Sequence, residues 1–325
     1  MPHKVRKMTD LEVLSHVQAS KHHATELREI GQLWQLRVLG VVIYDWKAQL
    51  ENLLQGISDL NECLQSLSIE IKPLPVTASK AATPHDIPAA DAISAHCKNT
   101  PKLLESLSIS GVTMYGRLLQ LFARDCCKLA KVTLHNTLLD QDDMESLADL
   151  PNLRGLWLCH VNLHTGGKLI IQTNGFQNLK YLAVEGGGIT DIDFKPGEAP
   201  KLEKLVWHVD GVESLSGINN LPKLKEIMFN DGVTLPDQVK QAIEDHPNFI
   251  DDNILPYTVV HLFSRIASPI HSNDDDGDDK VSSADQDEKY DEDEDGRSKQ
   301  EVSDTNQEIS HVPIDEEETA TASQP

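Results

Sequence analysis

Several features of secreted and membrane proteins are missing from this chain of 325 residues. Its five cysteines are scattered and odd in number, and no N-x-S/T site for N-glycosylation is present. No apolar segment of a secretory signal follows the basic residues 1–7. The apolar stretch 254–263 is far shorter than the roughly 20 residues that span a bilayer, and it contains Pro256. These absences predict a cytoplasmic protein without a membrane span, in which 254–263 is a docking segment or short helix.

Motifs that carry catalysis or hold a cofactor are missing as well. Gly166-Gly167-Lys168 is followed by Leu169 and lacks the first glycine of a phosphate-binding loop. The acidic run that starts at Asp291 resembles the first half of a calcium loop, but Val302 stands where the loop needs a bidentate glutamate. The 14 histidines form no H-E-x-x-H motif and no zinc spacing with cysteine, and no G-x-S-x-G is present. We therefore expect no enzyme, no cofactor, no metal ion and no catalytic residue.

Basic surface is also scarce, because the formal net charge is −23. Residues 272–325 hold 20 Asp and Glu against 4 Lys and Arg, with few aromatic or branched apolar residues. Such a segment cannot bury enough apolar surface to order itself, so a disordered acidic tail is predicted there. The acidic balance argues against a nucleic-acid partner, which needs a basic stripe.

What the chain does contain is a leucine pattern, L-x-x-L-x-L, that returns along its first 250 residues. The spacings between first positions are 22 to 28 residues, apart from one of 40 that includes a proline-rich insertion at 72–100. The first positions are Leu11, Leu36, Leu64, Leu104, Leu129, Leu153, Leu179, Leu202 and Leu224. The match is weakest at Leu11, where the sixth position is His16.

A repeat of this length cannot bury its own apolar face, so neighbouring repeats must stack. We predict an α/β fold, a leucine-rich repeat solenoid with a curved parallel sheet on its concave face and short helices and irregular turns on its convex face. Residues 142–148 and 237–244 are expected to be convex helical turns with acidic starts. The predicted domains are a solenoid of about nine repeats at 1–250, an inserted loop at 72–100, an apolar docking segment at 251–271 and the tail at 272–325.

The alternation of a strand separates core residues from surface residues. In the sixth repeat, Leu156 and Leu158 should point into the core, and Gly155, Trp157 and Cys159 toward the concave face. Exposed aromatic residues beside cations are typical of protein-binding surfaces. The predicted binding residues on this face are Lys131, Thr133, His135, Trp157, Tyr181, Lys204, Val206, His208 and Met228. Alternatively, Trp157 and Tyr181 fold over their neighbours and cover core leucines. The adjacent Cys126 and Cys127 are expected to be small buried or half-buried residues.

Several phrases along the chain resemble the leucine-rich repeat region of plant disease-resistance receptors, the coiled-coil nucleotide-binding class of cereals. The phrases cover roughly residues 1–250, and their order is more specific than any one of them. They are Met1–Leu14, Glu26–Arg37, Lys131–Leu134, Leu150–Arg154, Pro200–Trp207, Ser214–Ile218, Leu221–Glu226 and His246–Asn248.

In that family a coiled-coil signalling domain and an ATP/ADP-binding switch domain precede the repeats. The resemblance implies that the repeats restrain the switch and sense pathogen effectors, directly or through a guarded host protein. The chain itself has no phosphate loop and begins near the first repeat, so we expect it to correspond to the repeats alone. The hypothesis from the sequence is a plant defence protein whose concave face binds an effector, a host protein or a receptor nucleotide-binding domain. The alternative is an intracellular scaffold or adaptor without an immune role.

Overall fold

A computed structural model describes most of the first 249 residues. The described residues are 7–19, 24–44, 48–72, 97–111, 117–171 and 175–249, with the backbone of 257–260. The chain divides into two compact units, residues 1–266 and 267–325, and every described residue belongs to the first. The acidic tail expected at 272–325 and most of the loop expected at 72–100 therefore lie outside the described residues.

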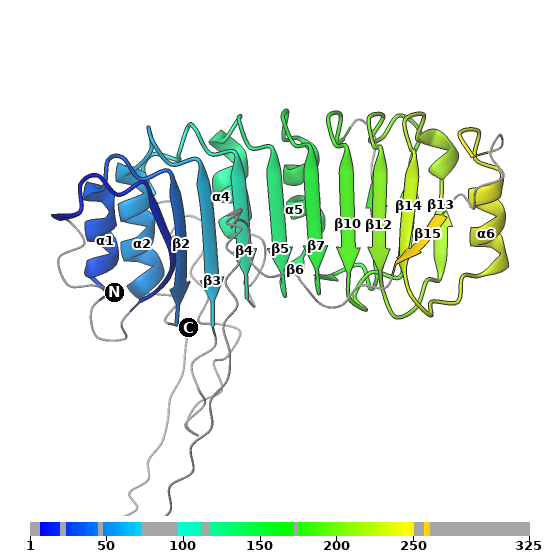
Figure 1. The fold of residues 1–325 in the computed structure, drawn as a ribbon, viewed down its shortest axis with the longest axis horizontal. Helices are drawn as coiled ribbons and strands as arrows, with labels where there is room; N and C mark the ends of the chain where they lie inside the picture. Colours follow the sequence, from blue (N-terminus) through cyan, green and yellow to red (C-terminus); the bar gives the residue numbers. More distant parts are fainter. Residues whose placement is uncertain are drawn as a thin grey trace, which may run out of the picture. The chain divides into compact units, whose positions relative to one another are not determined.

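One sheet of ten parallel strands runs through the first unit (Figure 1). Each predicted repeat contributes one strand, which begins two residues after its first leucine. These strands are β1 (Val13–Gln18), β2 (Val38–Ile43), β3 (Ser66–Ile71), β4 (Ser106–Ser110), β5 (Lys131–His135), β7 (Gly155–Cys159), β10 (Tyr181–Glu185), β12 (Lys204–His208) and β14 (Glu226–Asn230). They lie in the sheet in chain order, so each repeat is stacked on the one before it.

The register between neighbouring strands is unshifted from β2 to β14, which turns each repeat position into a row across the sheet. The fourth positions form an inward row in which every side chain is at most 1% exposed. Its members are Leu39, Leu67, Leu107, Val132, Leu156, Leu182, Leu205 and Ile227. Each such burial contributes about 1.5–3 kcal/mol. The core is therefore continuous along the stack, as the leucine pattern predicted.

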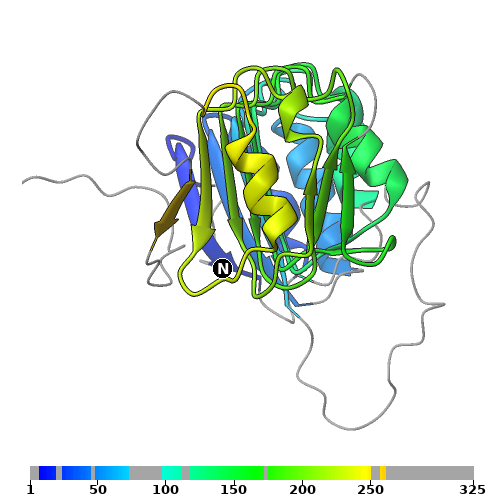
Figure 2. The same cartoon turned by 90° about the vertical axis from the view of Figure 1, so that its right-hand side faces the viewer.

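A second layer covers the inner face of this sheet (Figure 2). Its helices are α1 (Glu26–Glu29), η2 (Ile30–Gln32), α2 (Ala48–Asp59), α4 (Arg117–Asp125), α5 (Gln141–Ala148), η4 (Ile218–Asn220) and α6 (Asp237–Glu244). Its strands are β6 (Leu138–Leu139), β8 (Asn162–Leu163), β9 (Lys168–Ile171), β11 (Asp191–Phe194) and β13 (Ser214–Ser216). The helical turns expected at 142–148 and 237–244 are α5 and α6.

Repeat length accounts for only part of the change from helices to strands along this layer, since the 26-residue repeat from Leu153 carries β9 while the 24-residue repeat from Leu129 carries α5. The repeat that starts at Leu36 has 28 residues and carries the helix α2, whereas the repeats that start at Leu179 and Leu202 have 23 and 22 and carry β11 and β13. A helix advances about 1.5 Å per residue and a strand about 3.3 Å. The two shortest repeats therefore cross the second layer mainly in extended backbone. We expected short helices and turns on this side, so the three-stranded sheet β13-β11-β9 is a difference from that expectation.

Both ends of the large sheet depart from the sequence-based expectation. In β1, His16 has a left-handed backbone (φ 56°) and the pairing shifts, so that Leu14 lies opposite Leu39 and Val17 opposite Val41. The half-buried Val17, rather than His16, therefore takes the sixth position of the first repeat. At the other end, residues 257–260 are neither helix nor separate segment: they form β15 (Tyr257–Val260), which pairs with β14 as the tenth strand. The remainder of 251–271 lies outside the described residues.

The five cysteines are free thiols. Cys126 is buried and its thiol donates to the Pro101 carbonyl at 3.4 Å, which links two repeats. Cys127, which was expected to be buried or half-buried, is exposed. The difference arises because Cys127 lies in the turn after α4, where the chain runs along the surface before the next strand.

Trp207 shows how the core adapts near its C-terminal end. It occupies the sixth position of its repeat, where most repeats have an aliphatic residue, and it is 0% exposed. Its Nε1 donates to the Ile189 carbonyl at 3.1 Å, and its ring centroid lies 6.2 Å from that of Phe229. The indole thus packs against its neighbour on β14 within the large sheet and is hydrogen-bonded to the turn between β10 and β11.

Truncation of Trp207 should destabilise the protein strongly. We expect Trp207→Ala to lower the free energy of unfolding by about 3–5 kcal/mol, because it removes a large buried side chain and leaves a cavity. Trp34→Ala is the matched control, since Trp34 is 68% exposed, and it should change stability by less than about 0.5 kcal/mol. Urea denaturation followed by circular dichroism measures both. Equal midpoints for the two variants would contradict the assignment of Trp207 to the core.

His246 should make stability depend on pH. It is 0% exposed, it accepts a hydrogen bond from the Asn248 backbone at 3.2 Å, and its ring lies 4.8 Å from that of Phe249. Burial lowers its pKa below the ordinary 6.5, against the opposing effect of the Leu221 and Ile218 carbonyls. The unfolded chain therefore binds a proton more readily than the folded one. Stabilisation by this residue is complete above pH 6.5 and is lost as pH falls through the lowered pKa.

The measurement is the free energy of unfolding of the wild type and of His246→Gln between pH 8 and pH 5. The difference in the free energy of unfolding between wild type and His246→Gln should become smaller as the pH falls, because only the wild type carries the buried imidazole. His164→Gln serves as control, since His164 is an exposed histidine. A constant difference between wild type and His246→Gln across this range would show that the buried ring does not resist protonation.

Candidate protein-binding face

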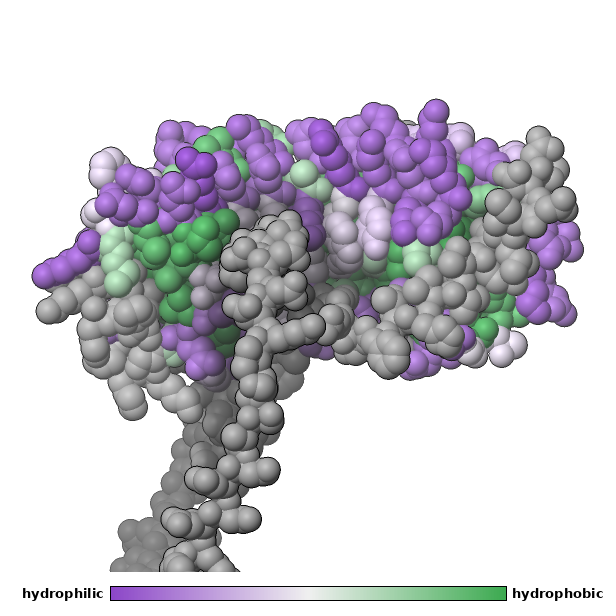
Figure 3. All heavy atoms as spheres, in the orientation of Figure 1, coloured by the Kyte–Doolittle hydropathy of each residue, from purple (hydrophilic) through white to green (hydrophobic). Residues whose placement is uncertain are grey.

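The face of the large sheet that lies away from the second layer is called here the open face. It corresponds to the predicted concave face, and Figure 3 shows it with hydrophilic residues along the edge where the strands begin. All nine predicted binding residues lie on strands of this sheet, at outward positions of β5, β7, β10, β12 and β14. Alternation along each strand determines the face, and the unshifted register determines which residues are neighbours.

The register arranges the predicted residues in three rows that run across the strands. The first row is Lys131, Gly155, Tyr181 and Lys204. The second row is Thr133, Trp157, Ala183, Val206 and Met228. The third row is His135, Cys159, Glu185 and His208. The leucine spacing sets this register, and the register places the predicted residues on one surface.

An aromatic pair occupies the centre of the first two rows. The ring centroids of Trp157 and Tyr181 lie 4.8 Å apart with the planes tilted by 30°, and Lys131 Nζ lies 4.6 Å from the Trp157 ring centroid. Lys204, beside Tyr181 in the first row, forms an ion pair with Glu226 at 3.0 Å. Burial raises the pKa of Tyr181, partly offset by the charge of Lys204, so its hydroxyl stays protonated at neutral pH. The pair is half-buried and fixed by its neighbours on both sides.

Trp157 also covers part of its own strand. A Cβ atom on Gly155 would overlap the six-membered part of the Trp157 ring, so the indole lies directly over this glycine. Gly155 is buried as a result, and Cys159, on the same outward side, is 2% exposed. The alternative that the aromatic residues cover their neighbours is therefore partly correct. What they cover is the backbone of the open face, while the core leucines beneath are already enclosed.

One of the predicted contact residues is buried rather than exposed. Val206 points outward but is only 7% exposed. Ala183 beside it in the second row is 8% exposed. Thr133 and Met228 remain half-buried and accessible at either side. Alternation predicts which way a side chain points, but the size of the neighbouring side chains decides whether it reaches solvent.

Three titratable groups of the third row, His135, Cys159 and His208, stay uncharged at neutral pH. Burial lowers the pKa of His135 and of His208, and the nearby Glu185 opposes this in both. Burial, together with Glu185, raises the pKa of the Cys159 thiol to about 12. These groups are neutral donors and acceptors at pH 7 rather than nucleophiles. Within the described part of the chain, no group of three or more His, Cys, Asp or Glu residues has the arrangement of a metal site.

A line of cations at the edge of the open face was not predicted. Arg154 and Lys180 immediately precede β7 and β10, and both are exposed. Lys180 and Lys225 flank Glu203 at 3.4 and 2.7 Å, forming a short ion-pair ladder along this edge. The signal in the sequence is the residue directly after the first leucine of each repeat. That position was not among the predicted binding residues, although it recurs with the same period as the leucines.

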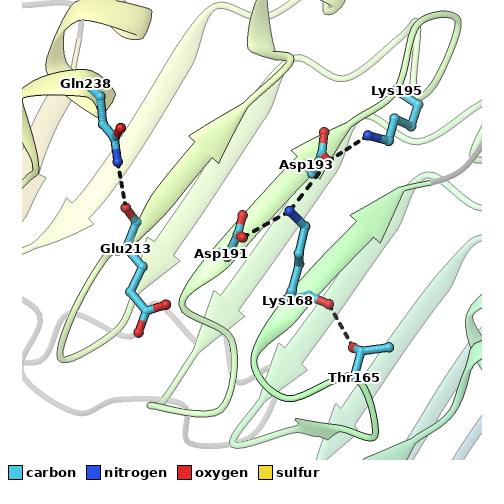
Figure 4. A network of polar contacts seen from close by, with 7 residues as sticks. All are labelled: Thr165, Lys168, Asp191, Asp193, Lys195, Glu213 and Gln238. Carbon is cyan, nitrogen blue, oxygen red and sulfur yellow. Dashed lines mark hydrogen bonds and ion pairs between the residues drawn. The ribbon is translucent and has the colours of Figure 1, made fainter.

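Lys168, from the rejected phosphate-loop match, lies on β9 in the second layer, and Figure 4 shows its polar contacts. Its Nζ lies 3.2 Å from Asp191 and 3.7 Å from Asp193, and Lys195 lies 2.7 Å from Asp193. The hydrogen bond from Lys195 lowers the pKa of Asp193. The network cross-links β9 and β11, and it engages the lysine that a phosphate loop would need to keep free.

A continuous parallel sheet, one strand per leucine repeat, defines the class of protein: an α/β leucine-rich repeat solenoid. A family model described as a leucine-rich repeat region matches residues 1–249, and the chain belongs to this family. Leucine-rich repeat domains mediate protein–protein binding, so the chain is a protein-interaction module.

No match was found among curated proteins. A solved structure similar to this chain is that of an internalin C2 from Listeria monocytogenes, with 18% sequence identity and a TM-score of 0.33. The match covers 66% of this chain and 83% of the internalin chain. In the described residues, no helix is both long and apolar enough to cross a bilayer.

Enlarging Gly155 should displace the aromatic pair. We expect Gly155→Val to push Trp157 off its strand, break the contact with Tyr181 and cost about 1–3 kcal/mol through overpacking. The Trp157 indole resonance in nitrogen-15 NMR spectra, assigned with Trp157→Phe, reports the displacement. Gly187→Val is the control, because a Cβ there meets only Asp210 Oδ2 at 3.6 Å. An unmoved indole resonance in Gly155→Val would show that the ring does not lie over this glycine.

Proposed function

We propose that this chain is a recognition and regulatory module of a plant disease-resistance receptor, and that its open face binds a pathogen effector, a guarded host protein or a receptor nucleotide-binding domain. The observation that carries the binding site is the fixed cluster of Lys131, Trp157 and Tyr181. Large aromatic side chains beside cations dominate the binding energy of many interfaces, because they bury much area at little cost in conformational entropy. The immune role is supported by the ordered phrases shared with the receptor repeats.

We propose a cytoplasmic location for this module. The support is the set of five free thiols, of which Cys97, Cys126 and Cys159 are buried and have pKa values raised to between about 11 and 12. A thiol of this kind stays protonated and unreactive in a reducing compartment. We also propose that the module is not catalytic. The neutral histidines and thiol of the third row support this, since their altered pKa values follow from burial rather than from activation.

The second candidate is a scaffold or adaptor without an immune role. It uses the same face and the same cluster, so the two candidates differ in the partner rather than in the site. The partner panel must therefore contain both kinds of protein. Association with general signalling proteins alone, with no effector, guarded protein or receptor domain bound, favours the scaffold.

The experiment is a binding assay with the purified full chain against a panel of plant pathogen effectors and nucleotide-binding domains of cereal resistance receptors. We expect at least one panel member to bind, and Trp157→Ala to weaken that binding by about tenfold or more, since the aromatic anchor is lost. Trp34→Ala is the control, because it removes an exposed tryptophan from a different repeat. Surface plasmon resonance gives the dissociation constants, and circular dichroism verifies the fold of each variant.

Two outcomes contradict the proposal. Binding that Trp157→Ala leaves unchanged in a folded variant places the site elsewhere than the open face. Absence of binding to every member of the panel rejects the disease-resistance role. The second result leaves the scaffold as the remaining candidate.

A further inference from the structure

Four cations surround the aromatic pair where the strands begin, and together they form what we call the basic–aromatic corner. Its members are Lys131, Arg154, Trp157, Lys180, Tyr181 and Lys204. Four of them lie on the consecutive strands β5, β7, β10 and β12, and Arg154 and Lys180 immediately precede β7 and β10. Adjacent strands are spaced by about 4.8 Å, so the four cations lie along roughly 15 Å of the sheet edge. That length matches a short extended segment of about four or five residues.

Backbone hydrogen bonds hold the corner in place. The Arg154 carbonyl accepts from the backbone N–H groups of Lys180 and Tyr181 at 2.8 and 3.0 Å. Lys131 lies opposite Gly155, and Tyr181 lies between Gly155 and Lys204 in the first row. The backbone positions of the charged residues are therefore determined by the sheet rather than by a mobile loop. A partner would meet a preorganised pattern of charge, which reduces the ordering cost of binding.

The cations of the corner are not equally available. Lys204 pairs with Glu226 at 3.0 Å and Lys180 with Glu203 at 3.4 Å. Among the described residues, Lys131 and Arg154 have no carboxylate partner, and Lys131 instead lies over the Trp157 ring at 4.6 Å. Lys131 contacts the indole and Arg154 immediately precedes the glycine that the indole covers, and both cations are exposed in a chain whose formal net charge is −23. A local excess of positive charge in an acidic protein selects for an acidic ligand at this place.

The aromatic pair adds an apolar requirement to the electrostatic one. Trp157 and Tyr181 are half-buried, in contact at 4.8 Å, and the part of each ring that stays accessible faces outward from the sheet. Because neither ring can fold further inward over the filled rows below, this area is available to a side chain from another molecule. A single apolar side chain of a partner fits such a platform, with water excluded by the surrounding lysine stems.

We propose that the basic–aromatic corner binds an acidic, extended segment of a partner protein, in which an apolar side chain packs on Trp157 and Tyr181 and neighbouring carboxylates pair with Lys131 and Arg154. The proposal rests on the proposed function, because it names the chemistry of the partner at the same face. A protein segment fits better than a nucleic acid. Two of the four cations already have carboxylate partners, and the edge offers no long unpaired basic stripe for a phosphate backbone.

The test uses fluorescence polarisation of labelled 12-residue peptides with the full chain. The probe alternates Glu and Asp around one central Phe. One comparison peptide has Ala in place of Phe, and another has Lys in place of every acidic residue. We expect the probe to bind, the Ala peptide to bind about fivefold or more weakly, and the Lys peptide not to bind. Raising the salt concentration from 50 to 200 mM should weaken the binding of the probe, since its contacts with the chain are charged.

Two matched double variants locate the contact. The double variant Lys131→Glu, Arg154→Glu should weaken the binding of the probe by about tenfold or more, because the charge of both unpaired cations is reversed. Arg37→Glu with Lys240→Glu makes the same change of charge at β2 and α6, outside the corner, and should leave binding within about twofold of wild type. Trp157→Ala should also weaken the binding of the probe by about tenfold. Circular dichroism shows whether each variant is folded.

Three results overturn the proposal: equal binding of the Lys peptide, equal weakening by both double variants, and tighter binding of a 12-nucleotide single strand than of the probe. The same variants separate this proposal from the proposed function. A panel partner that is sensitive to Trp157→Ala but insensitive to the Lys131→Glu, Arg154→Glu double variant keeps the proposed function and rejects the acidic segment. Probe binding that depends on the corner, with no panel partner bound, supports the acidic segment and rejects the disease-resistance role.

Discussion

Parallel pairing in an unshifted register is the constraint on which the rest of this structure depends. It places the fourth position of one repeat beside the fourth position of the next, from Leu39 to Ile227, so that each leucine is enclosed by two others. A single repeat would leave these side chains exposed on both sides, and its burial would not offset the cost of ordering the chain. Stability and surface pattern therefore have one origin: the register that aligns the core also aligns the outward residues.

That alignment gives the open face its chemical character. Because outward positions of successive repeats become neighbours, residues more than 70 positions apart in the chain, such as Lys131 and Lys204, share one row. The strands β5 to β12 carry the aromatic pair and its cations, whereas β3 and β4 present serines at the corresponding positions. The strands share one pattern of backbone pairing but carry different outward side chains. A partner that contacts several repeats would read these differences along the stack.

Much of the fold and part of the site could be predicted from residue spacing. The first leucines predicted the start of nine strands, and alternation predicted that Trp157 and Tyr181 lie outward. The burial of Val206 could not be predicted in this way, since it depends on the volumes of side chains in neighbouring rows. Nor could the cations at Arg154 and Lys180, because the position after each first leucine carries no strand signal. The bulge at His16 needed a left-handed backbone that the pattern does not specify.

By itself, the sequence determined the repeat, its phase and the residues that enter the core. The apolar positions recur once per repeat, and only stacking on neighbouring repeats can bury them. It also determined which residues face outward, because side chains alternate along a strand. Only the tertiary structure decided how those outward side chains contact one another: Trp157 over Gly155, Lys131 over Trp157, and Val206 buried among its neighbours. The physical reason is that such contacts depend on rotamers and volumes of residues from different repeats, which meet only after the stack has formed.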